Sequence, residues 1–307
     1  MSKTIDLAWG NPEFLHKIWE TVPMEEVLDE SPGNYSNGKG LLALKVAILA
    51  LHKRTHGYSP KKKVSIVIGA GATQVIQAAV YAHNKQQDQG KIRVFANTPH
   101  YSRFPILTEL AGGHWTRYAP QVEIITSPNN PDGKIPQSPL TAPKQIHDYS
   151  YNWKTYTSKI QPMDKDLMIF SMAKLSGHSD MRIGWAIVKD AKTAELMEEY
   201  IEMNTSGVSK QAQQAAISVL TTITTFSDSY FNGASEKLKS RWSKIESLKL
   251  PFKVLNKQGM FLYCKGECPK NIKGINGIEF SDSTENFRLN IGCSDKVFDQ
   301  FVKQYEK

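Results

Sequence analysis

Cysteine is scarce in this chain, with only Cys264, Cys268 and Cys293 among 307 residues. So few thiols, with no second pair to complete a zinc site, predict free cysteines in a reducing compartment. No apolar run approaches the ~18 residues that suggest a membrane span, and the first residues lack the charged-then-apolar order of a secretion signal. Histidine, aspartate and glutamate form no cluster that indicates a metal site. We therefore expect a cytoplasmic protein that uses neither a metal nor a membrane.

The net charge of +8 is compatible with nucleic-acid binding, but its distribution favours another interpretation. The lysines are spread along the chain, and the densest group, Lys61–Lys63, follows a proline and precedes an apolar run, as in a solvated turn. A positive field would also attract an anionic cofactor and carboxylate substrates. We expect no nucleic-acid partner.

Four residues in a fixed order carry the most information: Asp148, Tyr151, Lys174 and Arg182. Pyridoxal phosphate (PLP) needs an anion at its ring nitrogen, a donor at its phenolic oxygen, an amine for its aldehyde and a cation for its phosphate. Asp148, Tyr151, Lys174 and Arg182 supply these groups in turn, and Ser171 offers a further hydroxyl for the phosphate. The set therefore predicts a PLP site with Lys174 as the reactive amine.

The flanking residues predict how these side chains come together. Residues 144–148 read as a short strand that ends in the aspartate, and residues 166–171 and 182–188 are apolar runs typical of strands. Asp148 and Lys174 thus lie near the carboxyl ends of different strands, where open α/β sheets bind ligands. Taken alone, Asp148 and Lys174 could simply form a buried ion pair between two strands. The presence of Tyr151, Ser171 and Arg182 at these intervals favours the cofactor site over that interpretation.

Two loops add to the prediction. Residues 64–69 form an apolar strand that runs into Gly69–Gln74, which opens an amphipathic helix and so aims backbone N–H groups at an anion. Alone, this pattern fits a tight glycine turn equally well. Thr126–Gly133 contains two prolines and two asparagines after a strand, and an asparagine amide there can bind the phenolic oxygen; a plain surface turn explains only its second half.

The remaining pattern predicts an α/β protein with a smaller second domain. Strands alternate with helices or loops from residue 64 to 188, as in a mainly parallel sheet. Helices are expected over residues 41–51, 191–203, 210–224, 233–249 and 295–305, and strands over 252–255, 260–264 and 287–291. The second half suits a small α+β domain.

Five stretches resemble one family: residues 7–12, 126–133, 147–153, 174–190 and 206–210. The chain is similar to fold-type I PLP enzymes, the aspartate-aminotransferase superfamily, and within it to the tryptophan aminotransferase and alliinase group. The resemblance implies an aspartate-aminotransferase-like large domain with a mainly parallel seven-stranded sheet over residues 34–205. It also implies a small α+β domain from residues 1–33 and 206–307, PLP as cofactor, and a homodimer with shared active sites.

The resemblance also implies a role for each matching residue. Lys174 is the catalytic lysine, Asp148 the partner of the pyridine nitrogen, and Tyr101 the ring that stacks on the cofactor. Asn130 and Tyr151 bind the phenolic oxygen, and Arg288 the substrate carboxylate. The phosphate is surrounded by Ala72, Thr73, Ser171 and Arg182, with Tyr35 reaching the phosphate of a neighbouring subunit. Asn11, in the Gly10–Pro12 loop, binds substrate.

Some positions depart from the family pattern. Ala72 stands where the group usually has a serine, which removes one phosphate donor, and Ala173 replaces a serine or similar residue before the lysine. The group's Gly-Asp-Pro is Gly10–Pro12 here, with Asn11 in the centre. These changes leave the cofactor prediction intact and bear on the substrate.

Two reactions fit the resemblance. The first moves the amino group of an L-amino acid, aromatic and with tryptophan as the first expectation, to a 2-oxo acid such as pyruvate. The second is an alliinase-type C–S lyase reaction, the β-elimination of an S-substituted cysteine derivative. Both begin with proton removal by Lys174. The match around Lys174 and the lack of a secretory module favour the aminotransferase.

Overall fold

The centre of the molecule is a seven-stranded sheet. The computed structural model describes residues 4–21, 36, 38–136 and 142–306. The strand order is β2-β8-β7-β6-β5-β3-β4, and only β8 runs antiparallel to its neighbours. The strands are β2 (Ser65–Ala70), β3 (Arg93–Phe95), β4 (His114–Trp115), β5 (Val122–Thr126), β6 (Lys144–Asp148), β7 (Leu167–Ser171) and β8 (Ile183–Val188).

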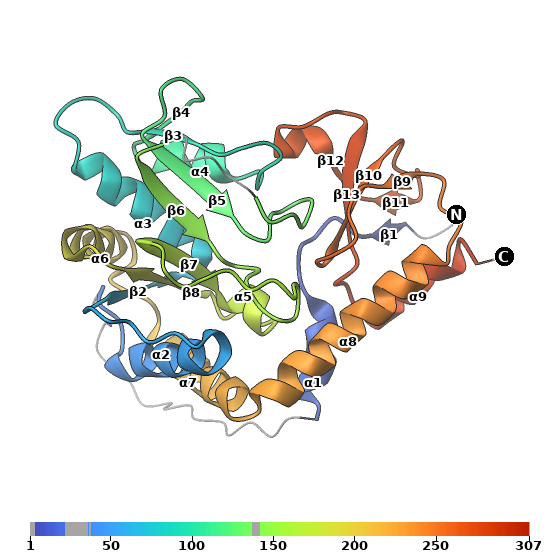
Figure 1. Cartoon of the computed structure of the whole chain (residues 1–307), viewed down its shortest axis with the longest axis horizontal. Coiled ribbons are helices and arrows are strands. Elements are labelled where there is room, and N and C mark those ends of the chain that lie inside the picture. The colour runs from blue at the N-terminus through green and yellow to red at the C-terminus, as the bar shows by residue number, and fades with distance from the viewer. Residues whose placement is uncertain (1–3, 22–35, 37, 137–141, 307) are drawn as a thin grey trace.

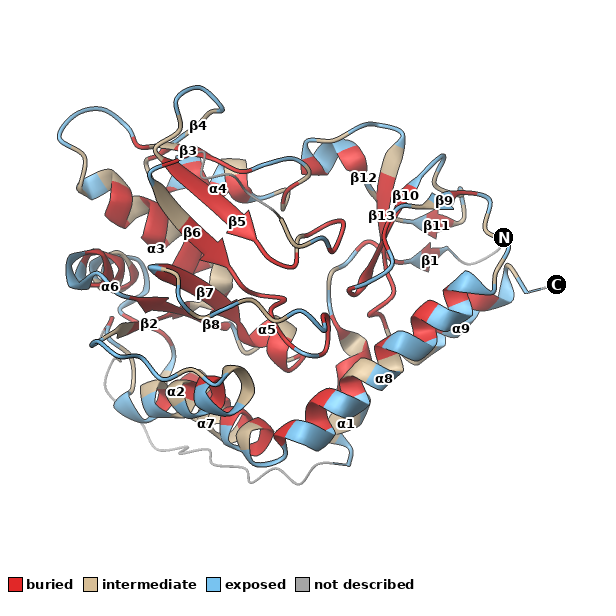
Figure 2. Cartoon of the chain, viewed as in Figure 1, coloured by how far each residue is buried: buried red, intermediate tan, exposed pale blue. Residues whose placement is uncertain are grey.

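Helices cover both faces of this sheet (Figure 1). One face carries α3 (Gly71–Lys85), α4 (Phe104–Leu110) and α6 (Ala191–Thr205), and the other carries α2 (Leu42–His56) and α7 (Lys210–Thr225). Because both faces are covered, β5, β7 and β8 are buried along their whole length, as Figure 2 shows. This explains why their sequences are apolar without alternation.

A smaller unit lies beside the large sheet. An antiparallel sheet has the order β12-β13-β10-β9, and a parallel pair joins β1 to β11 (Figure 1). Its strands are β1 (Ile5–Asp6), β9 (Lys253–Val254), β10 (Phe261–Lys265), β11 (Ile272–Lys273), β12 (Ile275–Asn276) and β13 (Asn286–Asn290). The other helices are η1 (Glu13–Leu15), α1 (His16–Trp19), α5 (Met172–Leu175), α8 (Ser227–Glu246), η2 (Gly277–Phe280) and α9 (Asp295–Lys303).

An aromatic cluster packs one side of the sheet near the carboxyl ends of its strands. Trp153, Phe170, Trp185 and Phe231 stack with ring centroids about 6 Å apart. The Trp185 indole donates to His52 Nε2 at 3.0 Å, so its single polar atom is satisfied inside the core. The loop that follows β6 is therefore anchored on a rigid base.

Most of the predicted elements are confirmed, but two helices have wrong boundaries, and the helix expected to end at residue 51 continues to His56. The expected strands at 144–148, 166–171 and 182–188 correspond to β6, β7 and β8. The helix expected from residue 233 to 249 begins earlier, at Ser227, and ends at Glu246. Gly233 lies inside it, where a Cβ would meet no described atom within 4 Å, so this glycine is a tolerated interior residue rather than a start.

The expected domain boundaries stay a prediction. β1 pairs with β11, so the first strand belongs with the smaller unit. By contrast, α7 follows the predicted boundary at residue 206 but packs against α2 and the large sheet. No helix in the described part of the chain is both long and apolar enough to cross a membrane.

Candidate active site

One cavity collects the predicted site residues. It has a volume of about 400 Å³ and lies at the carboxyl ends of β6 and β7, with residues 8–11 and Arg288 on its other side. The predicted residues that line it are Asn11, Ala72, Thr73, Tyr101, Asn130, Asp148, Tyr151, Ser171, Lys174, Arg182 and Arg288. Tyr35 lies outside the described residues.

Asp148 ends β6 in a fully enclosed position. Its Oδ1 accepts hydrogen bonds from the Ser150 N–H at 3.0 Å and the Ser150 hydroxyl at 2.6 Å, and Oδ2 accepts from Thr126 Oγ1 at 3.4 Å. Burial raises the pKa of the Asp148 carboxyl, while the hydrogen bonds and Lys174 act in the opposite direction. A buried carboxylate of this kind is stabilised by a cation placed against it.

Lys174 lies in α5, directly after β7, and its amine reaches into the cavity. Nζ donates to the carbonyl of Gly10 at 2.5 Å, and the Lys174 carbonyl accepts from the Tyr156 hydroxyl at 2.7 Å. Burial, together with Arg288 and Arg182, lowers the pKa of the Lys174 amine to about 8, against the pull of Asp148. The neutral, nucleophilic form is therefore far more populated near neutral pH than in an ordinary lysine.

The start of α3 and Arg182 form an anion-binding cradle. Ala72 and Thr73 lie in the first turn of α3, whose backbone N–H groups have no partner within the helix. Arg182 has a φ of 54°, and its guanidinium donates to the carbonyls of Ser179 at 2.9 Å and Ala70 at 3.4 Å. These contacts hold the arginine beside the helix start, where a phosphate would gain both interactions.

Two glycines keep the cradle open. A Cβ at Gly71 would lie 2.3 Å from Arg182 Nη2, and a Cβ at Gly184 would lie 2.3 Å from the backbone nitrogen of Ala72. Any side chain at these positions would push the helix start away from β8 or displace the arginine. The close approach of helix and strand therefore depends on both glycines.

Gly71→Ala is expected to weaken cofactor binding, whereas Gly90→Ala is not. The two glycines have similar φ values, 76° and 71°, at which alanine costs about 1–2 kcal/mol. They differ in surroundings, because no described atom lies within 4 Å of a Cβ at Gly90. Melting temperatures should fall in both variants, and PLP titration should show a higher Kd for Gly71→Ala alone. Equal Kd values in the two variants would contradict the cradle.

Arg288, on β13, is buried opposite the cradle. It donates to Asn130 Oδ1 and to the carbonyl of Ala8, both at 2.8 Å, and its guanidinium lies 4.1 Å from the centre of the Phe261 ring and 5.0 Å from that of Phe280. Nε is enclosed and has no hydrogen-bond partner among the described residues. Burial lowers the pKa of Arg288 to about 10. This desolvated, under-satisfied cation suits a carboxylate ligand.

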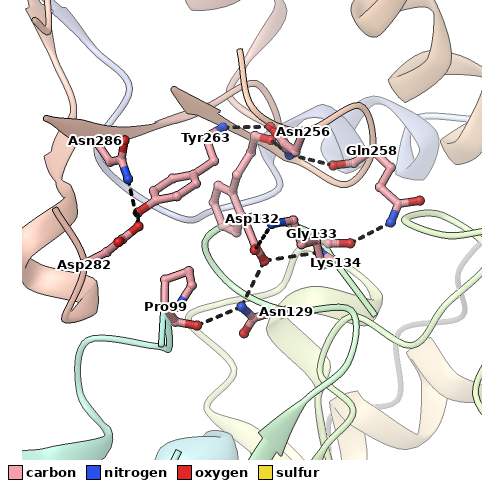
Figure 3. Close-up of polar contacts among 11 residues, drawn as sticks. Pro99, Asn129, Asp132, Gly133, Lys134, Asn256, Gln258, Tyr263, Asp282 and Asn286 are labelled. Carbon is pink, nitrogen blue, oxygen red and sulfur yellow. Dashed lines mark hydrogen bonds and ion pairs between the residues drawn. The ribbon is translucent and has the colours of Figure 1, made fainter. Parts of the chain in front are cut away.

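The loop that carries Asn130 is held against the smaller unit. The Gln258 side chain donates to the carbonyl of Gly133 at 2.8 Å, and the Asn129 side chain donates to the carbonyl of Pro99 at 2.9 Å (Figure 3). Asn130 itself also hydrogen-bonds the Tyr151 hydroxyl, whose pKa burial raises. The asparagine amide is thus fixed between a tyrosine and Arg288.

Sequence reasoning missed several of these contacts. Ser150 was not predicted, although a serine two residues after an aspartate is a recognised side-chain-to-backbone turn signal. No short-range signal marks the carbonyls of Ala8 and Gly10, because their donors come from distant parts of the chain. Among the described residues, no group of three or more His, Cys, Asp or Glu side chains is placed to hold a metal ion.

The donor set fits PLP. An enclosed carboxylate, a lysine with a lowered pKa and a helix-start cradle with an arginine share one cavity at the carboxyl edge of an α/β sheet. The two glycine contacts leave the cradle free for a phosphate. Fold and site together define the class of fold-type I PLP enzymes, and the alliinases and aminotransferases of this fold use pyridoxal 5′-phosphate.

Comparisons with known proteins identify the family. The alliinase family model, described as "Allinase", matches residues 39–265, so the chain belongs to the alliinase family. Tryptophan aminotransferase-related protein 2 of Arabidopsis thaliana is 34% identical over 80% of this chain and 61% of that protein. Alliin lyase of Allium cepa var. aggregatum is 30% identical over 72% of this chain and 54% of that protein. The chain thus spans less than two thirds of either relative's length.

Solved structures share the fold. An aminotransferase from Staphylococcus aureus superposes with a TM-score of 0.76 at 18% identity, covering 98% of this chain and 92% of that chain. A Thermus thermophilus aspartate aminotransferase double mutant also gives 0.76 at 16% identity, covering 98% and 91%. The expected aspartate-aminotransferase-like fold is confirmed.

Proposed function

We propose that this protein is a PLP-dependent aminotransferase that moves the amino group of an L-amino acid to a 2-oxo acid such as pyruvate. The observation that carries the proposal is the shared cavity in which Lys174, with a pKa of about 8, faces the buried Arg288 and Asp148. An α-amino acid needs these groups: a cation for its carboxylate and a base for its α-proton.

Each cofactor contact has a residue suited to it. Bound PLP supplies an aldehyde that condenses with amines and a ring that accepts electron density from the substrate α-carbon. Asp148 would keep the ring nitrogen protonated by charge pairing. Tyr151 and Asn130 would hold the phenolic oxygen, and Tyr101 would hold the ring. Ala72, Thr73, Ser171 and Arg182 would hold the phosphate.

The chain's own groups also handle the substrate. Arg288 binds the α-carboxylate through its planar guanidinium, and Asn11 lies at the same cavity. Lys174 Nζ would remove the proton from the substrate α-carbon and hold it for return during amino transfer. The Gly10 carbonyl accepts from this amine and so fixes its direction.

The donor is proposed to be aromatic, with tryptophan first. Support comes from relatives named tryptophan aminotransferase-related proteins, which are 34% and 31% identical to this chain. A second candidate is a C–S lyase acting on S-substituted cysteine derivatives, supported by alliin lyase relatives at 30% and 28% identity. Both reactions use Lys174 and Arg288 in the same roles.

One spectroscopic experiment separates the two reactions. L-tryptophan alone should bleach the visible absorbance of the lysine-bound cofactor, and pyruvate should restore it, since amino transfer is a pair of half-reactions. An unchanged spectrum, with pyruvate and ammonia released from an S-alkyl cysteine sulfoxide, would favour the lyase. Absence of any visible band after PLP addition would reject the cofactor site.

We also propose a homodimer, because sites in this superfamily are built across a two-fold interface. Light scattering behind a sizing column would give its mass, and a monomer would reject it. The cytoplasmic location stays a prediction that fractionation of cells can test.

A further inference from the structure

The cavity has a wall made of the N-terminal segment, residues 8–11. Each of the four carbonyl oxygens in this segment accepts a hydrogen bond, at 2.5–2.8 Å, from the side chain of Arg288, Asn290 or Lys174. Figure 1 shows the same segment running between the large sheet and the smaller one. The backbone of this wall is therefore fixed by Arg288 and Lys174, which line the cavity, and by Asn290.

Trp9 and Asn11 are exposed in this segment, whereas Ala8 is buried and Gly10 is partly buried. Leu7 and Ala8 are 1% and 8% exposed, whereas the Trp9 side chain is 66% exposed although it lines the cavity. A single exposed apolar residue is ordinary on a protein surface. Here the residue lines the cavity, and its backbone is fixed there because its carbonyl accepts from Asn290 at 2.6 Å.

The position of Trp9 relative to Arg288 defines what it can touch. Arg288 donates one N–H to the carbonyl of Ala8, the residue that precedes Trp9. A carboxylate bound by this guanidinium would therefore lie close to the backbone of Trp9. The side chain of an α-amino acid leaves from the carbon next to that carboxylate. Gly10 adjoins the same space, because a Cβ there would contact Phe261 Cζ at 3.4 Å and Lys174 Nζ at 3.8 Å.

We propose that the indole of Trp9 is the side wall against which the substrate side chain packs, and that it selects amino acids with an aromatic side chain. This inference rests on the proposed function for the position of the α-carboxylate. A flat aromatic surface beside a fixed carboxylate site favours a second ring in offset or edge contact. The half-buried Ile275 adds apolar surface to the same cavity.

The test measures binding without reaction. The probes are indole-3-propionate, which has the carboxylate and the ring but no amine, and propionate, which has the carboxylate alone. Calorimetric titration of the PLP-loaded protein should show Trp9→Ala binding indole-3-propionate at least about tenfold more weakly, with Trp9→Phe within about threefold of the unchanged protein. Propionate should bind all three proteins equally.

The control is Tyr118→Ala, which removes another aromatic that is 83% exposed and is not among the cavity residues. It should leave both dissociation constants unchanged. Steady-state rates should agree, with Trp9→Ala raising KM for L-tryptophan but not for L-alanine. An unchanged indole-3-propionate Kd in Trp9→Ala, or an equal loss for propionate, overturns the proposal. Failure of amino transfer with every amino acid would instead reject the proposed function, and would leave the Trp9 result valid.

Discussion

Replacing Lys174 with alanine should lower turnover by about 10²–10⁴-fold, the usual contribution of a positioned acid–base group. Among the described residues that line the cavity, it is the sole lysine, so no neighbouring amine can take over the proton transfer. The assay is steady-state amino transfer from L-tryptophan to pyruvate. The visible absorbance of the lysine-bound cofactor should disappear in the same variant.

The matched control is Lys189→Ala, since Lys189 is partly exposed and pairs with Asp166 outside the cavity. It should keep normal turnover. A small primary amine added to the Lys174→Ala protein should restore part of the rate if the missing base is the only defect. Turnover within tenfold of the unchanged enzyme, without added amine, would refute the assigned role.

Asp148→Asn should lower kcat by roughly 10²–10⁴-fold, because breaking a buried charge pair costs about 3–5 kcal/mol. The amide has nearly the same shape, so the change removes charge rather than volume. Asp166→Asn, at a side chain that is 88% exposed, is the matched control and should leave kcat unchanged.

The effect of Asp148→Asn on the melting temperature should differ between the cofactor-free and the PLP-bound protein. Burial raises the pKa of Asp148 against the opposing effect of Lys174, so its charged form is disfavoured when no protonated ring nitrogen lies beside it. At neutral pH the cofactor-free Asp148→Asn protein should therefore melt at or above the temperature of the unchanged one. With PLP bound, the order should reverse. Identical melting differences with and without PLP would show that Asp148 does not pair with the ring nitrogen.

The sequence predicted the parts of the site that depend on local order. β7 and β8 are apolar runs and β6 is a short strand ending in an aspartate, so their ends could be located, and with them Asp148, Ser171 and Lys174. The glycine turn before α3 was also visible, because strand, glycine and helix follow one another directly. Such features are short-range, and their residue types are dictated by burial and backbone geometry.

Contacts between distant segments could not be predicted in the same way. Asn130 and Arg288 were expected to bind different ligand atoms, yet their side chains hydrogen-bond each other. The helix start at Ser227 was missed because an interior glycine at 233 looks like a boundary when its surroundings are unknown. The pairing of backbone carbonyls with distant side chains depends on how the two sheets pack. The hydrophobic periodicity of the sequence does not predict that packing.

The N-terminal wall has a consequence for how the protein acquires its activity. The groups proposed for the phosphate and the reactive amine come from residues 71–182, whereas Ala8 meets its donor 280 residues later in the chain. Closing so long a loop is entropically costly, and on the ribosome the donor is made long after the residues of the cofactor pocket. We expect a nascent chain to acquire its cofactor pocket first, and its ability to hold an amino acid only once β13 has been released.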